Sequence, residues 1–102
     1  MSEPIVELAE IERAREAIAA TVRVTPVNGS PSLTELAGTP VHLKLEHTQV
    51  TGSFKLRGAS NAVASLSNAE KSRGVVGVST GNHGRGLAYA AKVAGVKCII
   101  CM

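Results

Sequence analysis

The sequence predicts an α/β fold with parallel strands. Three short aliphatic runs, at 41–45, 75–79 and 97–101, alternate with segments of helical spacing at 53–66 and 82–94. The connections between these segments are short and are marked by glycines and polar residues. Strands that alternate with helices in this way are typical of parallel sheets, because each helix carries the chain back along the sheet.

Two further helices and two loops are expected around this alternation. Residues 5–20 place aliphatic side chains near one helical face, which predicts an amphipathic first helix. A loop rich in proline, asparagine and glycine is expected at 26–31, followed by a short helix at 32–37. The polar segment 46–52 is interpreted as a loop, and the polar segment 68–74 as a helix-ending boundary between domains.

Composition excludes several classes of protein. The chain has 102 residues, of which 44% are hydrophobic and 19% charged, which is typical of a globular domain. Its 11 lysines and arginines are scattered singly, and only 2% of residues are aromatic, so a nucleic-acid partner is not expected. The sequence shows neither a secretory signal nor an apolar run of membrane-spanning length, so we expect a cytoplasmic protein without a membrane partner.

The spacing C-x-x-C at Cys98 and Cys101 raises the alternative of metal or redox chemistry. The pair lies in a predicted strand, where residues three apart point to opposite faces. Two thiols on opposite faces can share neither a metal nor a disulfide, so both are interpreted as small buried hydrophobic side chains. No metal spacing links the three histidines either, and no metal site is expected.

One lysine stands where a glycine turn becomes a helix. In the run T-G-S-F-K-L-R-G-A at 51–59, Lys55 is expected in the first helical turn, with Ser53 as the N-cap. The free N–H groups of such a turn favour anions and disfavour an ammonium group. A lysine so placed can attack a carbonyl carbon while a phosphate binds nearby, which suits pyridoxal phosphate. A solvent-exposed lysine without a function is the alternative.

A second turn, Ser79–Gly86, joins a strand to a helix, which is the usual ligand position in parallel α/β sheets. Its G-x-x-G-x-G spacing matches neither the dinucleotide fingerprint nor a nucleotide P-loop. Backbone N–H groups and the side chains of Ser79, Thr80 and Asn82 can hold an anion there. His83 is a candidate acid or base, and a purely structural turn is the alternative.

The two runs together resemble a known family. The run E-H-T-Q-V-T-G-S-F-K-L-R-G-A at 46–59 resembles the cofactor-lysine motif of threonine dehydratases and serine racemases, which are pyridoxal phosphate enzymes of fold type II (tryptophan synthase β-like). The run S-T-G-N-H-G at 79–84 resembles their substrate loop. The resemblance covers nearly the whole chain, so it implies the N-terminal portion of that parallel-sheet α/β fold.

The resemblance also implies a role for each site residue. Lys55 would form the Schiff base with the cofactor and later carry the Cα proton. Phe54 would pack near the cofactor ring, and Asn82 would hydrogen-bond the 3-oxygen of that ring. The substrate carboxylate would be held by Ser79, Thr80, Gly81, Asn82 and His83. The phosphate-binding residues of the family would lie downstream of residue 102.

By this resemblance, the activity would be dehydration of threonine, serine or a related 3-hydroxy amino acid to a 2-oxo acid and ammonia. Thr80 stands where racemases typically have serine, which disfavours the alternative of a serine or threonine racemase. The motif at 46–55 is also similar to family members related to ectoine breakdown, which implies an unusual hydroxy amino acid. A fragment that only binds anions or partners is the remaining alternative.

The resemblance further implies a division into domains. Residues 1–67 would belong to the large cofactor domain, and residues 68–102 would begin the small substrate domain. The chain ends in an apolar strand, so we expect it to be part of a longer protein that forms a homo-oligomer.

Overall fold

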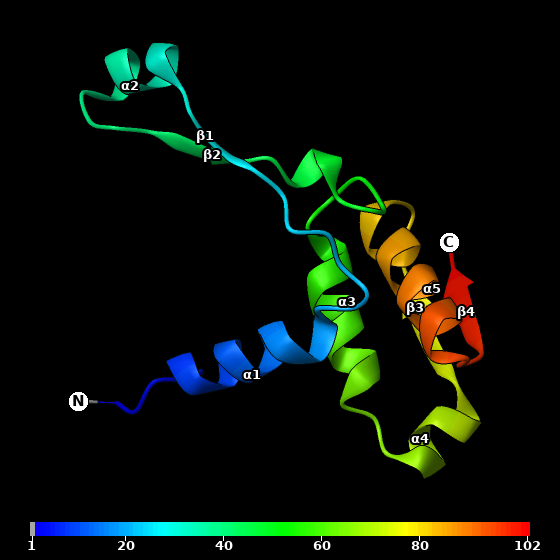
Figure 1. The fold of residues 1–102 in the computed structure, drawn as a ribbon. Helices are drawn as coiled ribbons and strands as arrows, with labels where there is room; N and C mark the ends of the chain where they lie inside the picture. The colour runs from blue at the N-terminus through cyan, green and yellow to red at the C-terminus, as the bar shows by residue number, and fades with distance from the viewer. Residues whose placement is uncertain (1) are drawn as a thin grey trace.

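The computed structural model describes residues 2–102 as an elongated molecule with a packed centre and two projections (Figure 1). Its dimensions are 51 × 36 × 25 Å, and its radius of gyration is 16.4 Å. A compact chain of this length would have a radius of gyration of about 13 Å. Much of the chain therefore extends away from a common core.

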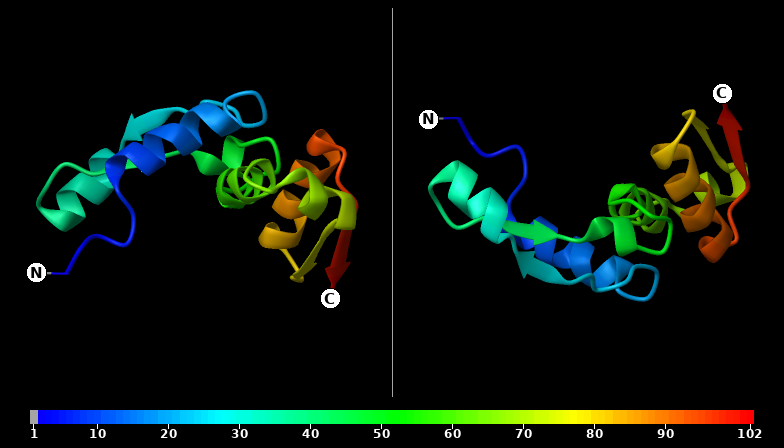
Figure 2. Two further views of the ribbon diagram at one scale, coloured as in Figure 1. Left: turned by 90° about the horizontal axis from the view of Figure 1, so that it is seen from below. Right: turned by 90° about the horizontal axis from the view of Figure 1, so that it is seen from above.

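The packed centre contains α3 (Lys55–Ala64), β3 (Val75–Val78), α5 (Asn82–Ala94) and β4 (Cys98–Cys101). Strands β3 and β4 pair in parallel, and α5 connects them. Figure 2 shows α5 between α3 and this two-stranded sheet. The predicted β-α-β unit is confirmed. Helix α5 has the bounds that were predicted for it, and each strand is one residue shorter than its predicted range.

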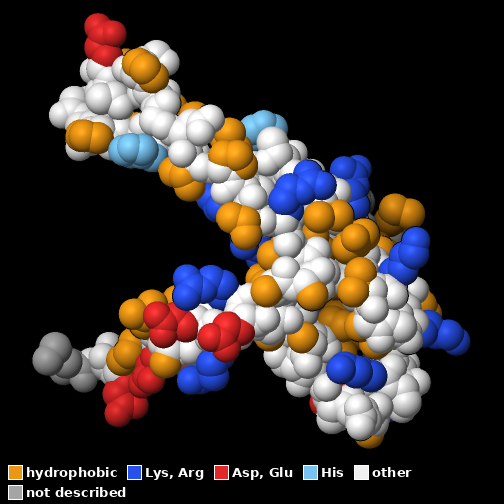
Figure 3. Space-filling model, in the orientation of Figure 1, with side chains coloured by type: hydrophobic (Ala, Val, Ile, Leu, Met, Phe, Trp, Pro, Cys, Tyr) orange, Lys and Arg blue, Asp and Glu red, His pale blue; other side chains and the backbone are white. Residues whose placement is uncertain are grey.

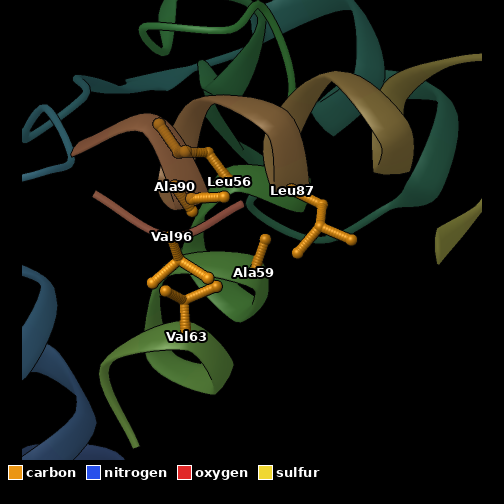
Figure 4. Close-up of a cluster of buried hydrophobic side chains, with 7 residues drawn as sticks. Leu56, Ala59, Val63, Leu87, Ala90 and Val96 are labelled. Carbon is orange, nitrogen blue, oxygen red and sulfur yellow. The ribbon is translucent and has the colours of Figure 1, made fainter. Parts of the chain in front are cut away.

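Aliphatic side chains fill the space between α3 and α5 (Figure 4). Leu56 is completely buried, and Ala59 and Val63 follow it at helical spacing on the same face of α3. Burial of such a stripe is what stabilises a short helix, because its hydrogen bonds alone are marginal in water. The buried cluster consists of Leu56, Ala59, Val63, Leu87, Ala90, Ala91 and Val96.

An arm projects from this centre and contains β1 (Val27–Gly29), α2 (Pro31–Ala37) and β2 (His42–Lys44). The two strands pair antiparallel with each other and form a sheet of their own. The expectation that 41–45 would join a parallel sheet with the later strands is therefore wrong. The interpretation of 26–31 as a loop is wrong as well, because residues 27–29 form a strand and Pro31 begins α2.

The physical reason for both differences lies in α2. A parallel crossover needs a helix long enough to return along the sheet, whereas α2 has seven residues and acts as a turn between neighbouring strands. Ser30 begins this turn: its N–H donates to the Val41 carbonyl at 2.9 Å, and its Oγ accepts from Leu33 N at 3.4 Å. Gly38 ends α2 in the left-handed conformation.

Two polar segments contain helical turns: 46–52, which was interpreted as a loop, and 68–74, which was interpreted as a helix-ending boundary. Residues 68–73 form α4, which begins with a reciprocal capping box between Ser67 and Glu70. Ser67 N donates to Glu70 Oε1 at 2.9 Å, and Glu70 N donates to Ser67 Oγ at 3.1 Å. Residues 46–48 form a 3-10 turn, η1 (Glu46–Thr48). Local capping thus orders sequence that lacks an apolar face.

Helix α1 (Leu8–Ile18) forms the second projection and is shorter than the predicted 5–20. Ile18 is buried against the centre, whereas Leu8 remains 70% exposed. Figure 3 shows α1 and the arm extending from the centre with a broad hollow between them. Only the C-terminal end of the predicted apolar face of α1 therefore packs against the rest of the chain.

The cysteine pair differs in part from its prediction. Cys98 is half-buried and packs on the core, but Cys101 is exposed, because alternate residues of β4 face away from α5. Both thiols are free, as expected. Within residues 2–102 the side chains form no cluster of metal ligands, and no helix is both long and apolar enough to cross a membrane.

Candidate active site

Lys55 is the first residue of α3 and carries an exposed side chain. The residue at the N-cap is Phe54, whose side chain makes no capping bond, so the prediction of Ser53 as the N-cap is wrong. Ser53 nevertheless accepts a hydrogen bond from the Lys55 N–H at 3.3 Å. The Lys55 Nζ lies 5.0 Å from the centre of the Phe54 ring, which is itself 58% exposed.

A half-buried carboxylate fixes the loop that leads to this lysine. Glu46 accepts two hydrogen bonds from the Arg57 guanidinium of α3. The Arg57 Nε donates to Oε1, and the terminal NH2 group donates to Oε2 at 3.1 Å. Thr25 Oγ1 donates to the same carboxylate at 2.5 Å. These bonds to Arg57, opposed by burial and aided by Thr25, lower the pKa of Glu46 to about 2. The charged pair ties the loop to the helix that follows it.

Gln49 fixes the other side of the same loop. Its side-chain amide is buried and binds the backbone of Arg23, in the segment that precedes the arm. The amide oxygen accepts from Arg23 N at 2.7 Å, and the amide nitrogen donates to Arg23 O at 2.9 Å. The Arg23 guanidinium also donates to the Thr48 carbonyl at 2.7 Å. The turn before Lys55 is therefore positioned by side chains from three segments of the chain.

A close helix contact brings the second predicted turn beside Lys55. Gly86 of α5 lies so near α3 that a Cβ there would be 3.1 Å from Leu56 N and 3.2 Å from Lys55 C. Only a residue without a side chain allows this approach. Gly52 in the lysine turn faces the same helix, since a Cβ there would lie 4.0 Å from the Arg85 guanidinium. The two turns that sequence analysis singled out are thus neighbours.

Ser79 organises the second turn from within. Its Oγ accepts hydrogen bonds from Gly84 N at 2.9 Å and from Gly81 N at 3.2 Å. Gly84 is required for this closure, because a Cβ there would be 3.2 Å from Ser79 Cβ and 3.1 Å from Ile100 Cγ2. The Ser79 hydroxyl therefore closes the turn before α5, whose N-cap is Gly81, and two of the N–H groups expected to hold an anion already have a partner.

The remaining polar groups of this turn face outward. Thr80, Gly81, Asn82 and His83 are exposed, and within residues 2–102 the backbone N–H groups of Thr80, Asn82 and His83 make no protein hydrogen bond. They lie at the positive end of α5, where an anion is favoured. The turn thus retains donors for an anionic ligand.

A hollow of about 300 Å³, here called the lysine hollow, joins the two turns. Residues from both turns line it, so the structure brings Phe54, Lys55 and His83 together. Ser79, Thr80, Gly81 and Asn82 lie in the adjacent turn but do not line it. The hollow is bounded by Phe54, Lys55, Arg57, Gly58, Ala59 and His83.

Sequence reasoning missed the residues that position the site. The pair Glu46 and Arg57 is eleven residues apart, so no helical spacing revealed it. Gln49 was part of a polar segment that looks solvated, although it is buried. Gly86 offered a signal, because a glycine one turn into a helix is unfavourable unless a neighbouring backbone approaches closely.

Comparison with known proteins places this geometry in a family. Residues 18–102 match the family described as "Pyridoxal-phosphate dependent enzyme". The chain belongs to that family, and its cofactor is pyridoxal phosphate. The expected fold, the N-terminal portion of fold type II, is confirmed by the same match and by the solved structures.

Curated relatives carry the names of two activities. A protein of Sinorhizobium fredii that is provisionally named a threonine dehydratase is 61% identical over 95 residues, which are 93% of this chain and 29% of the relative. The serine racemase of Dictyostelium discoideum is 47% identical over 95 residues, again 93% of this chain and 29% of the relative. The chain therefore spans less than a third of the length of the relatives it matches.

Solved structures agree with the arrangement of elements. The crystal structure of the Dictyostelium discoideum serine racemase superposes with a TM-score of 0.87 at 47% identity, covering 93% of this chain and 31% of that one. Maize serine racemase superposes with a TM-score of 0.86 at 38% identity, covering 95% of this chain and 30% of that one. The two motifs led us to expect a threonine dehydratase-like lyase sequence, and the name of the Sinorhizobium fredii relative agrees with that expectation.

Proposed function

We propose that this chain forms the lysine-bearing part of a pyridoxal phosphate-dependent dehydratase. Its substrate would be threonine, serine or a related 3-hydroxy amino acid, and its products a 2-oxo acid and ammonia. The observation that carries this proposal is the Gly86 contact, which places the His83 turn beside Lys55. The names of the relatives support the class of reaction.

The residues present fit the carbonyl and ring portions of the cofactor. Lys55 offers an exposed primary amine, and the exposed Phe54 ring lies beside that amine as an apolar face for a second ring. Asn82, at the first position of α5, offers an amide that can donate a hydrogen bond. When bound, the cofactor supplies the electron sink that stabilises a carbanion at the substrate Cα.

The chain's own groups would bind the cofactor and move the proton. Lys55 would hold the cofactor covalently through Nζ, and after substrate displaces it the same nitrogen would accept the Cα proton. The Glu46 and Arg57 pair would keep the Lys55 loop in place, because it joins that loop to α3. The β-hydroxyl would then leave with a proton as water, and hydrolysis of the released enamine would give the 2-oxo acid and ammonia.

The second turn would orient the substrate. The exposed N–H groups of Thr80, Asn82 and His83 lie at the start of α5 and would bind the substrate carboxylate, with the His83 ring on the side of Lys55. Ser79 and Gly81 would contribute by shaping the turn, since the Ser79 Oγ holds Gly81 N and Gly84 N. Fixing the carboxylate aligns the Cα–H bond with the catalytic amine.

Racemisation is the second candidate activity. The serine racemase of Dictyostelium discoideum is 47% identical to this chain, and Thr80 offers a hydroxyl beside the substrate turn. A racemase needs an acid or base on each face of the substrate, and the extra methyl of threonine restricts how its hydroxyl can be placed. A chiral assay of serine incubated with the holoenzyme separates the two activities.

Several broader features belong to the same proposal. Residues 1–67 would form part of the large cofactor domain and residues 68–102 would begin the small substrate domain. The full-length enzyme would act in cytoplasmic amino-acid metabolism as a homo-oligomer. If the cofactor-trapping test described next fails, the chain would instead be a fragment that binds anions without catalysis.

Trapping of the cofactor tests the proposal. Pyridoxal phosphate added to the purified chain should give a visible absorbance band, and borohydride reduction should attach it to the peptide that contains Lys55. Lys55→Ala should abolish both signals. Lys92→Ala, at an exposed lysine on α5, is the matched control and should leave both unchanged. Labelling spread over several lysines, or an unchanged band in Lys55→Ala, would contradict the site assignment.

A further inference from the structure

Basic side chains gather where α1, the arm and α3 meet. A concave site of about 230 Å³, here called the basic hollow, lies between α1, the segment that follows it, β2 and α3. Figure 3 shows lysine and arginine side chains on both walls of the space between α1 and the arm. Half of the residues that line the basic hollow are cationic, and the others are small or aliphatic. The cationic residues are Arg15, Arg23, Lys44 and Arg57.

Three of these four positive charges have no carboxylate partner. Arg57 is paired with Glu46, but within residues 2–102 the other three form no ion pair. Backbone carbonyls hold Arg23 and Lys44 instead, at 2.7 Å in both cases. A neutral carbonyl orients a cation without cancelling its charge. The basic hollow therefore keeps three uncompensated positive charges.

Hydrogen bonds bring two of the cationic groups to the same residue. The Lys44 ammonium donates to the Thr25 carbonyl, and the Thr25 hydroxyl donates to the Glu46 carboxylate that Arg57 binds. Arg15 lines the hollow from α1, and in the described part of the chain its guanidinium forms no ion pair. Cations gathered around one concavity repel one another and create a positive potential inside it. An anion bound between them would relieve that repulsion.

We propose that the basic hollow binds the phosphoryl group of a small ligand. A phosphate monoester carries up to about two negative charges and three acceptor oxygens, which suits cations that approach from α1, β2 and α3. A single arginine fork can satisfy a planar carboxylate, so a carboxylate would leave most of these cations unused. Ile18 and Val22 also line the hollow and would contact a short apolar portion of the ligand.

The basic hollow is separate from the candidate active site. Its lining shares only Arg57 with the lysine hollow, and neither Lys55 nor His83 reaches it. Binding of a phosphoryl group there requires neither the cofactor nor the substrate turn. The inference therefore goes beyond the proposed function, and the two can fail separately.

Calorimetric titration of the purified 102-residue chain with inorganic phosphate, at low ionic strength, tests the inference. Saturable binding is expected, and Arg15→Gln should weaken it about tenfold, because a charge-assisted hydrogen bond is lost. Arg15 is exposed and forms no ion pair, so the variant should keep the far-UV circular dichroism of the parent. Arg13→Gln is the matched control, at an exposed arginine of α1 outside the hollow, and should change the affinity less than about twofold.

Ethyl phosphate separates the two sources of a phosphoryl group. Tighter binding than inorganic phosphate would identify a phosphate monoester whose apolar part contacts Ile18, and equal binding would identify free phosphate. Absence of phosphate binding would overturn the inference, and so would equal affinities of the Arg15→Gln and Arg13→Gln variants. Loss of binding in Lys55→Ala would overturn it as well, because the anion would then lie at the candidate active site.

Discussion

The α3–α5 layer and the β1–α2–β2 arm contain similar aliphatic residues but use them differently. Leu56 of α3 is completely buried, whereas Leu36 of α2 is 84% exposed. The strands of the arm are exposed at every position, and no residue of α2 is buried. Backbone pairing and caps define the arm, while side-chain packing defines the layer.

This difference explains where the candidate site lies. Both turns that carry the polar residues are attached to α3 and α5, which the buried cluster holds together. The position of Lys55 relative to His83 therefore depends on packing between two helices and hardly on the arm. Substitutions in the layer should disturb the site, and matched substitutions in the arm should not.

The largest expected effect is loss of core packing. Leu56→Ala should lower the free energy of unfolding by about 3 kcal/mol, because it removes a buried side chain and leaves a cavity. Leu36→Ala in the arm should change it by less than about 0.5 kcal/mol, because that side chain already contacts water. Urea titrations followed by circular dichroism measure both. Equal effects would mean that the arm is packed as firmly as the layer.

Overpacking the helix contact should have the next largest effect. Gly86→Ala places a Cβ 3.1 Å from Leu56 N and should cost about 2 kcal/mol, because the two backbones must separate. Its counterpart in the arm is Gly29→Ala, where the Cβ would lie 3.9 Å from the His42 ring and should be tolerated. The same titrations compare the two, and a tolerated Gly86→Ala would show that the helices are not in close contact.

Removal of the half-buried Glu46 carboxylate should destabilise the chain in a pH-dependent way. The pKa of Glu46 is lowered from 4.5 to about 2, so its stabilising contribution is present above pH 4.5 and is lost as pH falls through 2. Glu46→Gln should therefore cost about 2 kcal/mol at pH 7, and the difference from the parent should vanish near pH 2.

Glu35→Gln, at an exposed position of α2, is the control and should have no effect at either pH. Unfolding free energies measured between pH 7 and pH 2 give the comparison. A Glu46→Gln difference that stays constant over that range would show that the ion pair with Arg57 does not stabilise the native chain.

The smallest expected effect concerns the helix caps. Ser79→Ala should cost about 1 kcal/mol, because Gly81 N and Gly84 N lose their acceptor. Ser30→Ala at the start of α2 should cost less, because its bond to Leu33 N is 3.4 Å long and exposed. Thermal unfolding of the two variants orders them, and a larger loss for Ser30→Ala would reverse the ranking of layer and arm.

The sequence predicted the layer better than the arm, and the reason is physical. Helix α5 has an apolar stripe bounded by glycines, so its bounds were predicted correctly from periodicity. The strand at 41–45 was predicted, but the arm strands have three residues each and no buried face, so nothing in the sequence indicated their pairing partner. Their antiparallel pairing depends on α2 acting as a turn, which spacing alone does not distinguish from a crossover.

The candidate site was predicted in its reactive residues but not in its supports. Lys55, Phe54 and His83 stand in motifs that sequence reasoning identified, and the structure places them around one hollow. Glu46 and Arg57 meet only because the loop folds back onto α3, a long-range contact with no local pattern. The roles of Lys55, Phe54 and His83 toward cofactor and substrate remain predictions.

Amide hydrogen exchange tests the central contrast most directly. The account predicts slow exchange for amides of α3 and α5 around Val63 and Ala90, which are buried and lie beyond the first helical turn, and fast exchange for amides of β1 and β2. Slow exchange in the layer alone would show that both turns of the candidate site rest on one stable unit. Equal protection of the arm, or unprotected amides at Val63 and Ala90, would contradict the account.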